Sequence, residues 1–301
     1  MSSLIPKKIY QSWKTKDMSN LSKKMLNAID SIKELNPDYT YELFDDVDCR
    51  KFILDNFGAI YADAFDDLIP GAFKSDFWRY AKLYIDGGVY MDIDFTELVP
   101  LDNIIKKDDI LLSVVDIKNI KDKPPCSIFQ AFIACVPKHK ILLKAFEISF
   151  NNIINHKNKI EGVNHELDIT GPVVMGRAMN IYWDKSSLLS IKPGIYKDPN
   201  YNGNIRLLQN TNKYVVDSEG LPLFKTKFDG YLNESLQKTN RYSYMDTYFK
   251  SFGNQWDKIT ERYIHTPMRK RKPKLLKYTI ITFILILIII CIYKCLKTLD
   301  I

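Results

Sequence analysis

The sequence is poor in the residue types that mark fibrous, disordered and disulfide-linked proteins. Its 301 residues include 12 glycines, 13 prolines and five cysteines. Glycine and proline are too scarce for a collagen-like or low-complexity chain, and a hydrophobic content of 46% suffices for a sizeable core. No two cysteines form a C-x-x-C pair. We therefore expect Cys49, Cys126 and Cys135 to be buried free thiols in a reducing compartment.

The main part of the chain also lacks an excess of positive charge. The formal net charge is +7, but residues 268–301 carry eight basic side chains and one acidic one, which accounts for the whole excess. Residues 1–267 are therefore neutral overall, and we expect no nucleic-acid binding. The four histidines show no metal-ligand spacing, and the first ten residues lack the apolar stretch of a signal peptide.

A long apolar run occurs near the C-terminus. Tyr278–Tyr293 has 16 residues without a charge, and with its flanks the run reaches about 30 Å as a helix, enough to span a bilayer rather than pack in a core. A basic segment precedes the run, so the positive-inside rule predicts a single-pass tail anchor with a cytosolic main domain. We expect a domain at 1–267, a basic linker at 268–274, a transmembrane helix at 275–296 and a short tail at 297–301.

Hydrophobic periodicity predicts an α/β domain. Strands are expected at 5–13, 39–44, 89–91, 110–115 and 129–136, and helices at 21–35, 48–56, 59–68, 73–85 and 138–154. Strands that alternate with helices indicate a layered domain with a largely parallel sheet. Short strands and turns are expected up to about residue 267, with an aromatic-rich segment at 242–263.

The stretch from Phe73 to Glu97 is the most informative for function. Asp76 and Arg79 share one face of the predicted helix, which two glycines end. The strand that follows delivers Asp92 and Asp94, whose i, i+2 spacing points both carboxylates to one side. Because ligands bind at the carboxyl ends of strands in open α/β sheets, we expect a binding site here.

An acid pair beside an arginine suits a substrate that carries a diphosphate. One or two carboxylates together with phosphate oxygens are the usual ligands of Mg²⁺ or Mn²⁺, which neutralises charge on a departing nucleotide diphosphate. Arginine adds a bidentate donor to a phosphate or a sugar hydroxyl. Each part alone is weak, since D-x-D is common in solvated loops and an i, i+3 Asp–Arg pair is usually a surface ion pair. Together the parts predict a metal-dependent transferase that uses a nucleotide sugar.

The run SDFWRYAKLYIDGGVYMDID resembles the signature of the DXD sugar-binding domain of glycosyltransferase family 32. IPKKIYQSWKT at 5–15, NPDYTYELFDD at 36–46 and Thr170-Gly171-Pro172 also resemble the family pattern, so that the resemblance covers about residues 4–180. It implies a GT-A type fold, which is Rossmann-like with a mixed, largely parallel sheet. It also implies retaining transfer of a hexose-type sugar from a UDP- or GDP-linked donor to a glycan, protein or lipid acceptor, with bound Mn²⁺ or Mg²⁺.

The resemblance further implies roles for single residues. The donor site would comprise Trp13, Asp76, Arg79, Tyr90, Asp92 and Gln130, the metal ligands would be Asp92 and Asp94, and the acceptor side would include Asp168, Thr170 and Trp256. Trp13 would stack on the base, and Tyr90 would brace the diphosphate. Asp92 would contact the ribose and metal-bound water, while Asp94 would bind the metal directly. The catalytic residues would be Asp76, Arg79, Asp92 and Asp94.

Two other functions stay open at this stage. Asp92 to Thr96 also fits the D-x-D-x-T of haloacid-dehalogenase phosphatases, whose first Asp is a nucleophile. Those enzymes need a further acidic pair much later in the chain, and Asp108-Asp109 follows too closely. The chain could instead be an inactive sugar-binding or tethering membrane protein, because Gln130 stands where relatives often have Asn and a late histidine before Trp256 is missing.

Overall fold

The computed structural model describes residues 3–19, 21–68, 71–116, 126–155, 169–211 and 213–226. The strands are β1 (Lys8–Ser12), β2 (Thr40–Phe44), β3 (Gly88–Met91), β4 (Thr96–Glu97), β5 (Asp109–Val115), β6 (Ile128–Cys135), β7 (Gly194–Lys197), β8 (Asn204–Asn210), β9 (Tyr214–Val216) and β10 (Pro222–Lys225). The helices are α1 (Lys23–Leu35), α2 (Asp46–Phe57), α3 (Ala59–Asp67), α4 (Gly71–Asp86), α5 (Leu101–Ile104), α6 (Lys140–Ile154) and α7 (Pro172–Tyr182).

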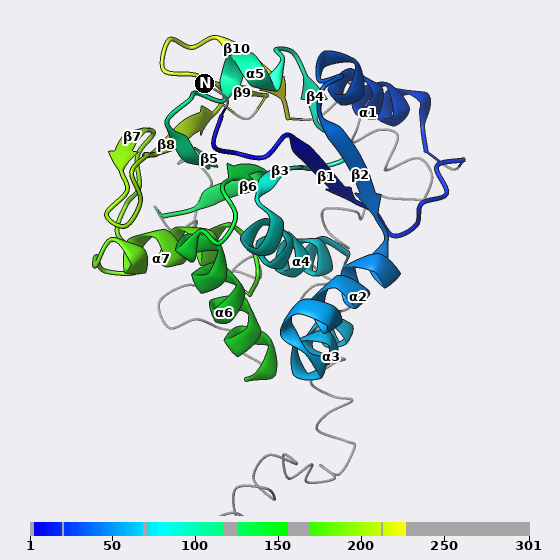
Figure 1. Ribbon diagram of the computed structural model, residues 1–301, viewed down its shortest axis with the longest axis vertical. Coiled ribbons are helices and arrows are strands. Elements are labelled where there is room, and N and C mark those ends of the chain that lie inside the picture. The colour runs from blue at the N-terminus through cyan, green and yellow to red at the C-terminus, as the bar shows by residue number, and fades with distance from the viewer. Residues whose placement is uncertain are drawn as a thin grey trace, which may run out of the picture. The chain divides into compact units, whose positions relative to one another are not determined.

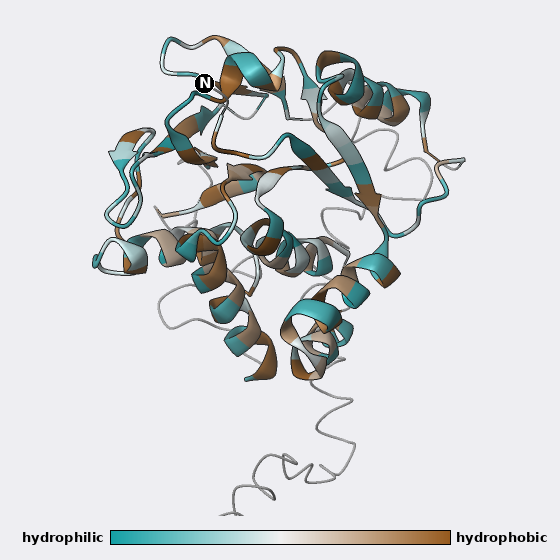
Figure 2. Cartoon of the chain, viewed as in Figure 1, coloured by the Kyte–Doolittle hydropathy of each residue, from teal (hydrophilic) through white to brown (hydrophobic). Residues whose placement is uncertain are grey.

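One mixed sheet organises the described part of the chain. Its strand order is β2-β1-β3-β6-β5-β8-β9-β10-β4, with β7 paired to β8 (Figure 1). Helices α2, α3, α4, α6 and α7 gather on one side of the sheet, and α1 and α5 lie on the other (Figure 1). Hydrophobic residues concentrate in the central strands and on the inner parts of the helices (Figure 2). The α/β class predicted from the sequence is confirmed, and each predicted helix and strand is present within a few residues of its expected bounds.

The prediction of a largely parallel sheet is wrong. Among the strand pairs in the described ranges, β1–β2, β1–β3 and β5–β8 are parallel, whereas the pairs of β6 with β3 and β5, and all those of β7, β9 and β10, are antiparallel. The reason is that β6 enters the centre of the sheet in the opposite direction to both neighbours. A buried strand is apolar whichever way its neighbours run, so its sequence pattern does not report direction.

The tight turn between α4 and β3 sets the position of the D-x-D pair. Gly87 and Gly88 have φ of 63° and 95°, which side chains with a Cβ rarely adopt. A Cβ on Gly87 would also lie 2.6 Å from the nitrogen of Pro137, and one on Gly88 would lie 2.9 Å from the carbonyl of Lys8. The two glycines therefore let β3 enter directly between β1 and β6, and the acids follow at its carboxyl end.

Other sequence expectations have mixed outcomes. Cys49, Cys126 and Cys135 are buried free thiols, as predicted. In the described ranges, we find no helix with both the length and the apolar character needed to cross a bilayer. The predicted linker, span and tail at 268–301 lie outside those ranges, and so does the aromatic segment at 242–263.

Candidate functional site

Helix α4 and the end of β3 bring the predicted acids and arginine together. Nη2 of Arg79 lies 3.2 Å from Oδ1 of Asp76 and 3.3 Å from Oδ1 of Asp92. The side chains of Asp76 and Arg79 are 12% and 5% exposed, whereas that of Asp92 is 36% exposed. One buried cation thus joins a buried acid on the helix to an accessible acid at the strand end.

Several further contacts fix the orientation of Arg79. Its Nη1 donates to the carbonyl of Gln130 at 2.7 Å, and its Nη2 donates to Oγ of Ser75 at 2.9 Å. The guanidinium carbon lies 4.0 Å from the centre of the Tyr90 ring, a cation–π contact. Burial lowers the pKa of Arg79, but the negative charge of nearby oxygen groups outweighs burial and raises it, so the side chain stays cationic.

Hydroxyl groups link β1, α4 and the D-x-D pair. The Tyr90 hydroxyl donates to Oδ1 of Asp92 at 2.8 Å, and Oγ of Ser75 lies 2.9 Å from the Tyr90 hydroxyl oxygen. Ser75 also shares a hydrogen bond of 2.7 Å with Oγ of Ser12 on β1. Ser75 belongs to none of the sequence motifs, although it lies one turn before Arg79 on the same helical face. It holds both Arg79 and Tyr90 in place.

Asp76 lies among buried polar partners. Its Oδ2 accepts a hydrogen bond from Oγ1 of Thr170 at 3.1 Å. Burial raises the pKa of Asp76 to about 7, against the opposing effect of the Arg79 charge. The hydroxyl of Tyr80 donates to Oε1 of Gln130 at 3.2 Å and to the carbonyl of Thr170 at 2.9 Å. Thr170 and Gln130 are therefore brought to the site as buried partners of α4.

The D-x-D turn lies against an apolar cluster that includes Trp13. Ile93, between the two acids, is 5% exposed and packs with Met25 and Ile29 of α1, and Trp13 packs against the same cluster. Asp94 is partly exposed. Trp13 and the D-x-D turn are thus connected through one hydrophobic cluster. Asp168 and Trp256, two of the three predicted acceptor-side residues, lie outside the described residues.

The two accessible acids fit one type of metal site. In the part of the chain that the structure describes, no three or more His, Cys, Asp or Glu side chains gather in a metal-binding group. Mg²⁺ and Mn²⁺ accept one or two carboxylates when substrate phosphates and water supply the other ligands. Asp92 and Asp94, both partly exposed at a strand end, fit that donor set.

Comparisons with known proteins agree with the motifs. Residues 22–111 match the family model described as glycosyltransferase sugar-binding region containing DXD motif. An initiation-specific alpha-1,6-mannosyltransferase of Candida albicans is 32% identical over 129 residues, 40% of this chain and 34% of that protein. The mannosyl phosphorylinositol ceramide synthase SUR1 of Saccharomyces cerevisiae is 26% identical over 208 residues, 68% of this chain and 47% of that protein.

The matches cover limited parts of these proteins. The chain spans between a third and a half of the length of the two relatives above. Among solved structures, the PaToxG glycosyltransferase aligns with a TM-score of 0.45 and 20% identity, over 59% of this chain and 68% of that chain. The sequence matches confirm the resemblance to glycosyltransferase family 32, and residues 22–111 match the model of a DXD-containing sugar-binding region.

Proposed function

We propose that this chain is a metal-dependent, retaining glycosyltransferase with a GT-A type fold. It transfers a hexose-type sugar, with mannose the first candidate, from a UDP- or GDP-linked donor to a hydroxyl of a glycan, protein or lipid. One observation carries the proposal: Arg79 contacts both Asp76 and Asp92, and the open side of this group is the partly exposed D-x-D end. The matches to mannosyltransferases support the choice of sugar.

Different side chains suit different parts of the nucleotide-sugar donor. Trp13 offers a ring beside the D-x-D turn on which a base stacks. Asp92 and Asp94 would hold a divalent ion, and the ion would supply neutralisation of the negative charge on the departing diphosphate. Arg79, locked by Gln130, Ser75 and Tyr90, keeps its charge at a fixed place and needs no rearrangement when the reaction begins.

Asp76 is suited to bind a sugar hydroxyl. Its carboxylate is buried, and an ionised carboxylate accepts hydrogen bonds more strongly than a neutral group does. Arg79 balances the negative charge at 3.2 Å. The chemistry then depends mainly on positioning an acceptor hydroxyl at the anomeric carbon.

Membrane attachment through residues 275–296, with the catalytic domain on the cytosolic side, is part of the proposal. Its basis is the apolar run and its basic flank. Protease treatment of intact vesicles that contain an N-terminally tagged chain tests it. Digestion of the tag is expected, and a protected tag would contradict the cytosolic placement.

A donor screen tests the proposed substrate class. The full chain is heated with UDP- and GDP-linked sugars, each with and without Mn²⁺, and the melting temperature is recorded. A ligand that binds the folded state at 100 times its Kd stabilises it by about 2.7 kcal/mol. We expect one nucleotide sugar to raise the melting temperature, more so with Mn²⁺, and Asp94→Asn to abolish the Mn²⁺-dependent part. No shift with any nucleotide sugar would refute the donor assignment.

A further inference from the structure

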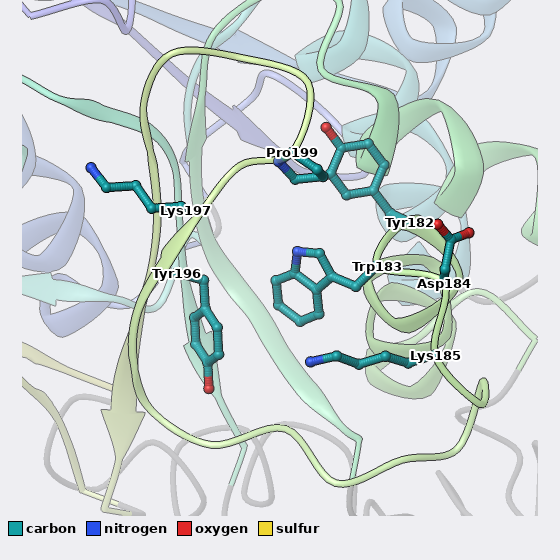
Figure 3. A pocket seen from close by; sticks show the side chains of 7 residues that line it. All are labelled: Tyr182, Trp183, Asp184, Lys185, Tyr196, Lys197 and Pro199. Atoms are coloured by element: carbon teal, nitrogen blue, oxygen red, sulfur yellow. The ribbon is translucent and has the colours of Figure 1, made fainter.

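A cavity lies at the end of helix α7 that is farther from the D-x-D site. Its volume is about 290 Å³, and it is lined by Tyr182, Trp183, Asp184, Lys185, Tyr196, Lys197 and Pro199 (Figure 3). This volume lies just below the range of about 300–1,000 Å³ for small-molecule sites. The lining comes from the end of α7, the three residues that follow it, β7 and Pro199, so neither α4 nor the D-x-D pair contributes to it.

The aromatic walls of this cavity are held in place. The Tyr182 hydroxyl donates to Oδ1 of Asp198 at 2.7 Å, and the same oxygen accepts the backbone N–H groups of Asn200 and Tyr201. The Tyr196 hydroxyl donates to the carbonyl of Lys192 at 2.7 Å. Walls fixed before a ligand arrives lose little conformational freedom on binding, which favours affinity.

Trp183 and Tyr196 line the cavity as a pair of neighbouring aromatic rings. Their ring centres lie 5.1 Å apart with 30° between the planes, and both rings are partly exposed (Figure 3). The Lys185 ammonium lies 5.0 Å from the centre of the Trp183 indole ring. A partly exposed tryptophan–tyrosine pair offers an apolar surface to a ligand that is itself partly apolar.

The rim of the cavity is polar and carries both signs of charge. Asp184, Lys185 and Lys197 are exposed. Lys185 extends along the Trp183 ring, whereas the Lys197 ammonium and the Asp184 carboxylate point outward from the aromatic pair (Figure 3). Carboxylate oxygens accept hydrogen bonds and ammonium groups donate them, so the rim can pair with hydroxyl groups of either role. A pyranose ring combines an apolar C–H face with a girdle of hydroxyls, and it matches this arrangement better than a polyanion or a purely apolar ligand does.

We propose that this cavity is a saccharide-binding subsite that holds a distal part of the acceptor glycan. Helix α7 runs from the D-x-D site to this cavity. Thr170, just before the start of α7, donates a hydrogen bond to Asp76, and Trp183 follows the last residue of α7. Its 11 residues span about 16 Å. A saccharide that engages both places must therefore contain more than one sugar ring. Saccharide binding rests on the cavity alone, whereas the acceptor role rests on the proposed transferase function.

Glycan binding to the full chain tests the subsite. Mannose oligosaccharides of one to six residues and a broader glycan array serve as probes, and binding is followed by quenching of tryptophan fluorescence and by saturation-transfer NMR. We expect the affinity for the best glycan to fall at least tenfold in Trp183→Ala and in Tyr196→Ala. Trp183→Phe, which keeps an aromatic ring, should retain most of the affinity, and Tyr214→Ala on β9 is the matched aromatic control.

The outcomes separate the subsite from the transferase. Asp94→Asn should keep the glycan affinity of the wild type while it loses donor turnover, and Trp183→Ala should keep donor hydrolysis while it loses glycan affinity. Glycan binding that depends on Trp183 in a chain without donor turnover would support the subsite and refute the transferase. Failure of the wild type to bind any glycan, or equal binding by wild type and both folded alanine variants, would overturn the subsite.

Discussion

Nη2 of Arg79 lies 3.3 Å from Oδ1 of Asp92, and this contact joins helix α4 to the D-x-D pair across the turn at Gly87 and Gly88. The same guanidinium donates to the carbonyl of Gln130 on the neighbouring strand. The position of the Asp92 carboxylate is therefore coupled to the Arg79 guanidinium, which Gln130 holds in place.

Arg79→Lys is expected to lower donor turnover on the order of a hundredfold, the usual effect of losing one fixed donor at a reacting charge. Lysine keeps the charge but cannot contact Gln130, Ser75 and both acids with one planar group. Steady-state kinetics measures the loss. Arg50→Lys, which changes a surface pair with Asp66, is the control. Turnover of Arg79→Lys at the wild-type rate would show that the planar guanidinium, with its several donors, is not needed.

Ser75→Ala is expected to reduce kcat roughly tenfold, while the melting temperature falls only slightly. The substitution removes the hydroxyl that holds Arg79 and Tyr90, and each such hydrogen bond contributes about 1 kcal/mol. Kinetics and thermal unfolding are measured together. Ser218→Ala, at an exposed position between β9 and β10, should leave both quantities unchanged. A drop in melting temperature with kcat intact would assign Ser75 to stability alone.

Donor turnover is expected to rise with pH through about 7. Burial raises the pKa of Asp76 to about 7, so the carboxylate that accepts a sugar hydroxyl forms only as pH approaches and passes that value. The profile of kcat/KM against pH reports the pKa of the free enzyme. A profile that is flat between pH 6 and 8 would mean that ionisation of Asp76 does not control donor use.

The folded state is expected to be less stable at pH 8 than at pH 5, and Glu97→Gln should reduce that difference. Burial raises the pKa of Glu97 from 4.5 to about 8, although the hydrogen bond from Asn36 opposes the shift. A raised folded-state pKa gives stability that is complete below pH 4.5 and is lost as pH rises to about 8. Urea unfolding at both pH values measures it. An equal pH dependence in wild type and variant would contradict the assignment.

The sequence predicted the part of the site that depends on local geometry. Helical spacing places Asp76 and Arg79 on one face, and the two glycines and the apolar strand place Asp92 after a turn. These relationships lie within a short segment, so periodicity and turn chemistry determine them. The pairing of Arg79 with Asp92 follows from that arrangement.

Contacts between distant segments could not be predicted in the same way. Thr170 bonds to Asp76 across 94 positions, and the antiparallel entry of β6 places the Gln130 carbonyl at Arg79. Neither contact leaves a periodic signal, because each depends on how the whole sheet is connected. The pairing of Trp183 with Tyr196 has the same origin, since it joins the end of α7 to a later strand.

Release of UDP or GDP from a nucleotide sugar by the purified full chain tests the central claim most directly. With Mn²⁺ and the donor chosen by thermal shift, the wild type should release nucleotide, and Asp63→Asn, at an exposed position on α3, should do so equally. Asp94→Asn should lose the activity at least a hundredfold. Wild type that releases no nucleotide with any acceptor, or Asp92-dependent hydrolysis of an aryl phosphate in its place, would contradict the assignment of this chain as a glycosyltransferase.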